Sequence, residues 1–214
     1  CKHILDPESA WPEYRGHVQT GYDEVREHVP PVTASVVLHH HQRYDGTGFP
    51  VKRTTKEASG VMEGTRIHVF SRIVAVADAF DHLMCPQGRP LPTVMALHQI
   101  RQPRFKGWFD PIVLEALRRL IPPFMVGSMV TLSDGSQAAV VTNHAEAPCR
   151  PTVRILTKPP SSHDSRAARL LDLRMCRNIG VAMVDGIDVR QCIYSGDTEP
   201  QGALAGMGAA FDAA

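Results

Sequence analysis

The sequence has few cysteines, almost no net charge and no long apolar run. Its five cysteines include no CxxC pair, which excludes a zinc ribbon and a disulfide framework and predicts free thiols in a reducing cytoplasm. The 23 Lys and Arg residues are balanced by 22 Asp and Glu residues. The chain therefore lacks the overall positive charge that would predict binding to DNA, RNA or an anionic membrane. No apolar run approaches the roughly 20 residues of a bilayer-spanning helix.

The first part of the chain has enough apolar residues for a core and the periodicity of helices. Paired prolines at positions 30 and 31 separate the first two expected helices, and Asp110-Pro111 is an N-cap followed by proline at the first helical position. The expected helices span residues 12–28, 32–41, 65–84 and 93–100, with a fifth that begins at Asp110-Pro111. Their expected buried side chains are Ile67, Phe70, Val74 and Ala77 in the third helix and Val113, Leu117 and Leu120 in the fifth.

After Pro122-Pro123 the pattern changes to short strands. A hairpin is expected at 129–141 and a third strand at 152–156, with short strands near Leu170, Val181 and Val189 after a polar linker at 158–166. The predicted fold class is therefore a mainly α helical bundle followed by a small β-rich C-terminal module. The expected domains are 1–122 and 123–195, with a flexible tail at 196–214. Because the chain opens on Cys1 rather than Met, we expect it to be part of a longer protein.

Three consecutive histidines, His39, His40 and His41, are the most unusual feature of the sequence. Neutral imidazole binds iron, manganese and zinc well, and polar rings at the apolar end of a helix are costly without partners. Adjacent side chains on a helix point about 100° apart. We therefore expect His40 and His41 to serve two neighbouring ions, or one ion and a substrate group, rather than one ion together. The alternative is a solvated cluster, or rings held by hydrogen bonds in the core.

Asp78 and His17 extend this set of candidate ligands. Asp78 follows four small apolar residues on the expected inward stripe of its helix, where a carboxylate needs a cation or several donors. The alternative is an N-cap or a salt bridge, for instance to Arg72. A hard oxygen ligand beside imidazoles favours iron or manganese over structural zinc. With His17, which by itself is more often a surface residue, the set would come from three helices. Asp81, one turn beyond Asp78, either orients a histidine or is a solvated charge.

Residues 40–50 read His-His-Gln-Arg-Tyr-Asp-Gly-Thr-Gly-Phe-Pro. This segment resembles the signature of the HD-GYP domain, a bacterial branch of the HD superfamily of metal-dependent phosphohydrolases, whose usual form is His-His-Glu, a basic residue, an aromatic residue and Asp-Gly-x-Gly-Tyr-Pro. A His-x-x-x-Gly segment from His17 precedes it, and Arg-Ile-x-x-x-Ala-Asp-x-x-Asp-x-Leu from Arg72 follows it. With the later Phe109-Asp110-Pro111 and a hairpin seen in some members, the resemblance covers roughly residues 1–157.

The resemblance implies metal-assisted hydrolysis of the bacterial second messenger cyclic di-GMP, to pGpG or GMP, at a centre of two or three iron or manganese ions. It also implies contacts with signalling domains such as diguanylate cyclases, and an aromatic ring at position 49 that stacks on a guanine or anchors the loop. The implied metal ligands are His17, His40, His41 and Asp78. The implied substrate-binding residues are Asp45, Gly46, Gly48, Phe49, Pro50, Arg72 and Arg89. Gln42 and Asp81 are implied to orient ligands.

Several departures from the family pattern leave alternatives open. No His-Asp pair precedes His17 in this chain, so the catalytic residues stay unassigned and the 214-residue chain is expected to hydrolyse cyclic di-GMP poorly. Gln42 stands where the family has Glu, Phe49 where it has Tyr and His82 where it has Ala, and the segment 51–71 is long. One alternative is a degenerate HD-GYP module that binds nucleotide or a signalling partner without turnover. Another alternative is an HD-type phosphohydrolase that acts on a different nucleotide. The loop from Asp45 to Pro50 argues against this alternative.

Overall fold

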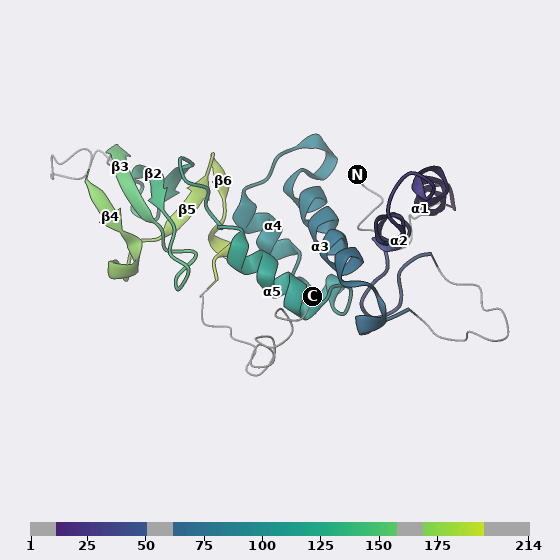
Figure 1. Cartoon of the computed structure of the whole chain (residues 1–214). Helices are drawn as coiled ribbons and strands as arrows, with labels where there is room; N and C mark the ends of the chain where they lie inside the picture. The colour runs from purple at the N-terminus through teal and green to yellow at the C-terminus, as the bar shows by residue number, and fades with distance from the viewer. Residues whose placement is uncertain (1–11, 51–61, 158–168, 195–214) are drawn as a thin grey trace. The chain divides into compact units, whose positions relative to one another are not determined.

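The chain divides into two compact units, residues 1–121 and 122–214. The computed structural model describes residues 12–50, 62–157 and 169–194. The predicted linker at 158–166 and the predicted tail at 196–214 lie outside these residues. The first unit is helical and the second is built on a β-sheet (Figure 1), which confirms the predicted order of a helical part followed by a β-rich part. Within the described residues, no helix combines the length and the apolar composition that crossing a bilayer requires.

The described part of the first unit has five α-helices, as predicted. Pro31 and Pro111 each occupy a first helical turn, where no backbone N–H partner is needed. Asp110 caps the last helix, because its carboxylate accepts a hydrogen bond from the N–H of Ile112 at 2.8 Å. The helices are α1 (Pro12–Val25), α2 (Pro31–His39), α3 (Val69–Met84), α4 (Thr93–Gln99) and α5 (Pro111–Leu120). Short 3-10 turns span Gly64–Arg66, Pro86–Gly88 and Pro103–Phe105.

Helix α3 begins four residues later than predicted and buries a different face. The His68 ring accepts a hydrogen bond from the N–H of Phe70 at 3.2 Å, and this cap starts the helix at Val69. The predicted stripe is wrong, since Phe70 is 54% exposed, Val74 is 38% exposed and the buried Ile67 precedes the helix. Helix α3 is apolar around most of its circumference, so periodicity alone did not fix the buried face. Its buried side chains are Ser71, Val76, Ala79 and Leu83.

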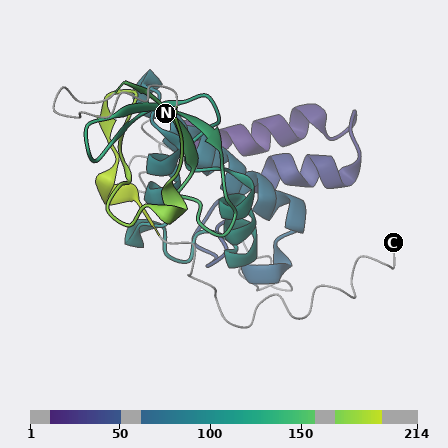
Figure 2. The ribbon, with the colours of Figure 1, turned by 90° about the vertical axis from the view of Figure 1, so that its left-hand side faces the viewer.

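The core of the helical unit lies where α3, α4 and α5 meet. Val76, Ala79 and Leu83 of α3 pack there with side chains of α4, of the turn that follows it, and of α5. Leu117 joins this core, but the predicted inward residue Leu120 is 78% exposed, because it is the last residue of its helix. Helices α1 and α2 lie side by side as an antiparallel pair (Figure 2), and Val18 of α1 is buried.

The second unit contains the predicted hairpin within an antiparallel sheet. Its strands are β1 (Met129–Leu132), β2 (Gln137–Thr142), β3 (Thr152–Thr157), β4 (Leu170–Asp172), β5 (Val181–Val184) and β6 (Ile187–Asp188), in the order β4-β3-β2-β1-β5-β6. Alternate residues such as Val130 and Leu132 are buried, as the period of a strand requires. Val189, predicted in a strand, directly follows β6 and is buried. Arg150, which lies just before β3, fixes the segment between β4 and β5 by donating to the carbonyls of Leu173, Cys176 and Ile179.

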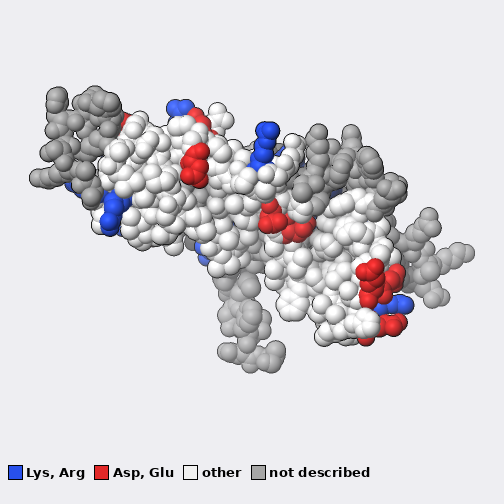
Figure 3. Space-filling view, turned by 90° about the horizontal axis from the view of Figure 1, so that it is seen from above, with Lys and Arg blue, Asp and Glu red and all other residues white. Residues whose placement is uncertain are grey.

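The surface charges of both signs are interspersed. Figure 3 shows Lys and Arg side chains between Asp and Glu side chains on the face in view. Several of them pair with each other, for example Arg174 with Asp172 at 2.7 Å. The four cysteines in the described part of the chain are free thiols, as predicted.

Candidate metal centre

The α1–α2 pair brings histidines from two helices together. His17 lies on α1, and His40 directly follows α2. Gly21 lies one turn beyond His17, and a Cβ atom at Gly21 would be 3.2 Å from Cγ1 of Val37 on α2. Because glycine has no such atom, the two helices approach closely at the turn next to the histidines.

His17, His40 and His41 form one cluster. One ring nitrogen from each histidine lies within 4.8 Å of the other two, and the Nε2 atoms of His17 and His40 are 3.5 Å apart. The ring centroids of His40 and His41 are only 4.2 Å apart. The expected divergence of these two side chains does not occur, because α2 ends at His39 and both residues lie in the turn beyond it. The third histidine of the run, His39, turns back on its own helix and lies 3.0 Å from the carbonyl of Ser35.

Hydrogen bonds to the backbone fix where two of these rings carry their lone pairs. Nδ1 of His17 donates to the carbonyl of Tyr14, and Nδ1 of His40 donates to the carbonyl of Val37 at 2.8 Å. A neutral imidazole has a single N–H, so both Nε2 atoms carry lone pairs and neither donates to the other. Two nitrogens that bind one ion at 2.0–2.1 Å lie roughly 2.8–3.4 Å apart for bond angles of about 90° to 110°. The observed separation of 3.5 Å therefore suits a shared cation.

His41 is held in its neutral form. Burial, assisted by the neighbouring histidines, lowers the pKa of His41 to about 3. The ring stacks on Phe49 with centroids 4.7 Å apart and an angle of 26° between the planes. The hydroxyl of Tyr14 lies 3.3 Å from Nε2 of His41, and burial, with the charge of Asp78 as the lesser cause, raises the pKa of Tyr14 to about 12. The neutral imidazole is the form that binds a metal ion.

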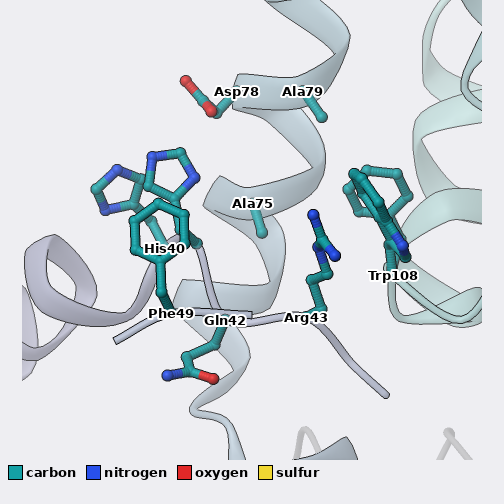
Figure 4. Close-up of a pocket in the computed structure, with 10 residues that line it drawn as sticks. His40, Gln42, Arg43, Phe49, Ala75, Asp78, Ala79 and Trp108 are labelled. Atoms are coloured by element: carbon teal, nitrogen blue, oxygen red, sulfur yellow. The ribbon is translucent and has the colours of Figure 1, made fainter. Parts of the chain in front are cut away.

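Asp78 lines the same pocket as His40 and His41. Figure 4 shows its carboxylate on the side of α3 where His40 lies. Its Oδ1 is 3.4 Å from Nδ1 of His82, and the same ring nitrogen donates to the backbone carbonyl of Asp78 at 2.7 Å. The salt bridge to Arg72 does not form. In the described part of the chain the 4.8 Å cluster consists of the three histidines alone, so the place of Asp78 among the ligands stays a prediction.

The loop after the histidines folds back onto them through a contact that requires glycine. A Cβ atom at Gly48 would lie 2.3 Å from the carbonyl oxygen of His41. The N–H of Phe49 donates to that same carbonyl at 3.1 Å, which places the Phe49 ring against the histidines. Gln42 is buried and donates its side-chain amide to the carbonyl of Pro50. Gln42, predicted to orient a ligand, is thus observed to hold the loop closed.

The first half of the loop is tied to the segment before α5. The N–H of Tyr44 donates to the carbonyl of Trp108 at 2.8 Å, and the N–H of Asp45 donates to the carbonyl of Gly107 at 2.9 Å. The exposed Asp45 carboxylate accepts hydrogen bonds from the N–H and the hydroxyl of Thr47. Asp45 therefore shapes the turn, which continues through Gly46 at a φ of 81°.

Three predicted residues lie away from the histidine cluster. Arg72 donates to the buried Asp110 carboxylate and to the carbonyl of Ile67, so its charge is neutralised between α3 and α5. Arg89 and Asp81 are exposed. None of the three lines the pocket beside the histidines.

Sequence reasoning missed four side chains around the site. Tyr14 precedes His17 by three residues and His82 follows Asp78 by four, so helical spacing offered a signal for both. Arg43 and Trp108 also line the pocket, but they meet only in the folded chain.

Comparison with known proteins adds two family matches. Residues 13–113 match the model described as HD domain, and residues 129–185 match the model described as KOW domain associated with HD domain. The helical unit belongs to the HD domain family, in its HD-GYP branch. HD domains are metal-dependent, which agrees with the histidine cluster.

Curated relatives of this HD-GYP chain are named as cyclic di-GMP phosphodiesterases. One from Pseudomonas aeruginosa is 28% identical over 156 residues, which cover 71% of this chain and 34% of the relative. One from Thermotoga maritima is 32% identical over 122 residues, covering 55% of this chain and 30% of the relative. The response regulator RpfG of Xanthomonas campestris is 36% identical over 94 residues, covering 41% of this chain and 21% of RpfG. The chain thus spans about a third or less of the length of these relatives.

Proposed function

We infer that this chain carries the metal-binding part of a cyclic di-GMP phosphodiesterase site, which hydrolyses the messenger to pGpG or GMP in the bacterial cytoplasm. The observation that carries this inference is the meeting of three imidazoles from α1 and the end of α2, with the lone pairs of His17 and His40 facing each other at 3.5 Å. The HD domain match and the names of the relatives support the substrate class.

The proposed ligands are His17, His40 and His41, with Asp78 from α3 as the carboxylate. Imidazoles with a hard oxygen ligand suit iron or manganese, and a complete site would hold two or three ions. An ion held by these residues would supply Lewis-acid chemistry, which would neutralise phosphate oxygens and activate water for attack on the phosphodiester.

The surrounding residues keep the ligands in place. The hydrogen bonds from Nδ1 of His17 and His40 to backbone carbonyls hold each ring in the tautomer that binds through Nε2. Phe49 covers one face of His41 and keeps water from it. The proposed contact with the nucleotide or with a diguanylate cyclase partner is the loop after the histidines, through Asp45, Gly46, Gly48, Phe49 and Pro50. The further proposed phosphate contacts are Arg89 and Arg72, and Arg72 also pairs with Asp110.

A second candidate function is a module that binds cyclic di-GMP without turnover. The observation in its favour is Gln42, which is uncharged and donates to the carbonyl of Pro50. A glutamate at this position would add negative charge beside the histidines, and Gln42 does not. The two candidates differ in turnover and agree on metal and nucleotide binding.

The metal ligands are tested by elemental analysis of purified variants. We expect His17→Ala, His40→Ala and Asp78→Ala each to lose most of the iron or manganese, because each removes a ligand. His39→Ala is the matched control, since its ring lies next to the site in sequence but faces Ser35, and it should keep the metal. Unchanged metal in His17→Ala and His40→Ala would refute the centre.

Turnover is tested with manganese-loaded full-length protein and cyclic di-GMP, because the 214-residue chain itself is expected to hydrolyse the substrate poorly, and pGpG and GMP are separated from the substrate. Hydrolysis that disappears in His40→Ala and persists in His39→Ala supports the phosphodiesterase. Tight binding of cyclic di-GMP without any product favours the binding module instead.

A further inference from the structure

Arg43 projects into the pocket from the segment that directly follows the histidines. Figure 4 shows its side chain rising beside Ala75 of α3, with the guanidinium facing Trp108. The same pocket is lined by His40 and His41, so a fixed positive charge stands next to the histidine cluster.

Most N–H groups of the Arg43 guanidinium are available to a ligand. Of its five N–H groups, one donates to Oγ1 of Thr47 at 3.3 Å, which is a long hydrogen bond. Among the described residues, no carboxylate lies within ion-pair distance of it. Arg72 differs, because it pairs with Asp110, and so does Arg119, which pairs with Glu115 at 2.9 Å.

Trp108 holds the Arg43 side chain in position. The guanidinium carbon lies 3.2 Å from the centroid of the Trp108 ring, where a cation is attracted to the aromatic face. The backbone bond from Tyr44 to the Trp108 carbonyl fixes the two segments against each other. Stacking of this kind uses the flat face of the guanidinium and leaves its N–H edge free for a planar or tetrahedral oxyanion.

We propose that Arg43 binds the phosphodiester oxygens of the substrate and that Trp108 is its positioning residue. This assignment rests on the proposed function, because it takes the anion beside the histidines to be a phosphodiester. Arg43 contributes charge and paired donors on one side of the pocket, and the histidine cluster holds the metal on the other side. The substrate phosphate would bridge the two.

The test measures the dissociation constant of cyclic di-GMP by calorimetry on manganese-loaded full-length protein. Arg43→Gln is expected to weaken binding about 10- to 100-fold, the loss typical of a charged hydrogen bond. Arg43→Lys should lie between wild type and Arg43→Gln, because lysine keeps the charge but loses the fork and the stacking. Trp108→Leu should weaken binding by about 3- to 10-fold. Trp108→Phe, which keeps an aromatic face, should recover most of this loss.

Arg26→Gln is the matched control, since it removes the same charge from an exposed position directly after α1 and should leave binding unchanged. Manganese content and the unfolding midpoint should stay at wild-type values in the Arg43 variants. Equal dissociation constants for Arg43→Gln and wild type, or a loss of manganese in Arg43→Gln, would overturn the assignment and leave the proposed function standing. A wild-type protein that does not bind cyclic di-GMP would overturn both.

Discussion

Gly48 offers a sharp test of how the loop supports the histidine cluster. In Gly48→Ala, the new Cβ atom would lie 2.3 Å from the N of Arg43 and 2.3 Å from the O of His41. Both are backbone atoms, and ordinary carbon contacts need roughly 1 Å more. The backbone on one side of the loop must therefore move. This movement breaks the hydrogen bond from the N–H of Phe49 to the carbonyl of His41. We expect a loss of about 3 kcal/mol in the free energy of unfolding, the upper range for overpacking.

Thermal unfolding checks this magnitude. For a unit of this size, about 3 kcal/mol corresponds to a midpoint lowered by roughly 10 °C, and the manganese content should fall because the carbonyl of His41 is displaced. Gly16→Ala is the matched control. Gly16 lies within α1 beside His17, and a Cβ atom there meets nothing within 4 Å, so alanine should stabilise the helix by about 0.5–1 kcal/mol. The reasoning is wrong if both variants unfold at or above the wild-type temperature.

Three further tests, with four substitutions, probe the packing within each unit. Asp110→Ala should cost about 3–5 kcal/mol, because it leaves the partly buried Arg72 without its carboxylate and removes the cap of α5; denaturant unfolding measures this, and a cost below about 1 kcal/mol would contradict the ion pair. Arg150→Met should lower the unfolding midpoint of the β unit, since three carbonyls lose their donor, and an unchanged midpoint would show that water replaces it. Leu83→Ala should cost about 2–5 kcal/mol and the exposed Leu120→Ala less than about 0.5 kcal/mol; similar costs would contradict the core assigned here.

Much of the fold could be predicted because its boundaries are set by local chemistry. Pro31, Pro111 and the Asp110 cap fix where α2 and α5 begin. The turn Ser133-Asp134-Gly135-Ser136 fixes the β1–β2 hairpin, and Gly135 has a φ of 85° there. The buried face of α3 could not be predicted in this way. Its apolar residues lie on several sides, and which side is covered depends on α4 and α5, whose packing is not written in the local sequence.

The candidate ligands could be predicted from sequence because imidazoles and an inward carboxylate are unusual in apolar helices. The side chains that contact them were harder to predict. The stacking of Arg43 on Trp108 depends on a tertiary contact between distant segments. Arg72 is a proposed phosphate contact by its position in the motif, and the structure shows that it also pairs with Asp110, the N-cap of α5. A charged residue next to a motif therefore gains a role only once its partners are known.

The convergence of the histidines depends on where α2 ends. If α2 continued as a helix through His41, the His40 and His41 side chains would point about 100° apart. Instead the N–H of Gln42 bonds back to the carbonyl of His39 at 3.0 Å, and the chain then turns so that Gly48 touches the backbone of His41. Gly48 is consequently part of the histidine cluster in a physical sense, since its close approach to His41 allows the bend that brings two adjacent imidazoles together. A substitution that extends α2 would separate the ligands without removing any of them.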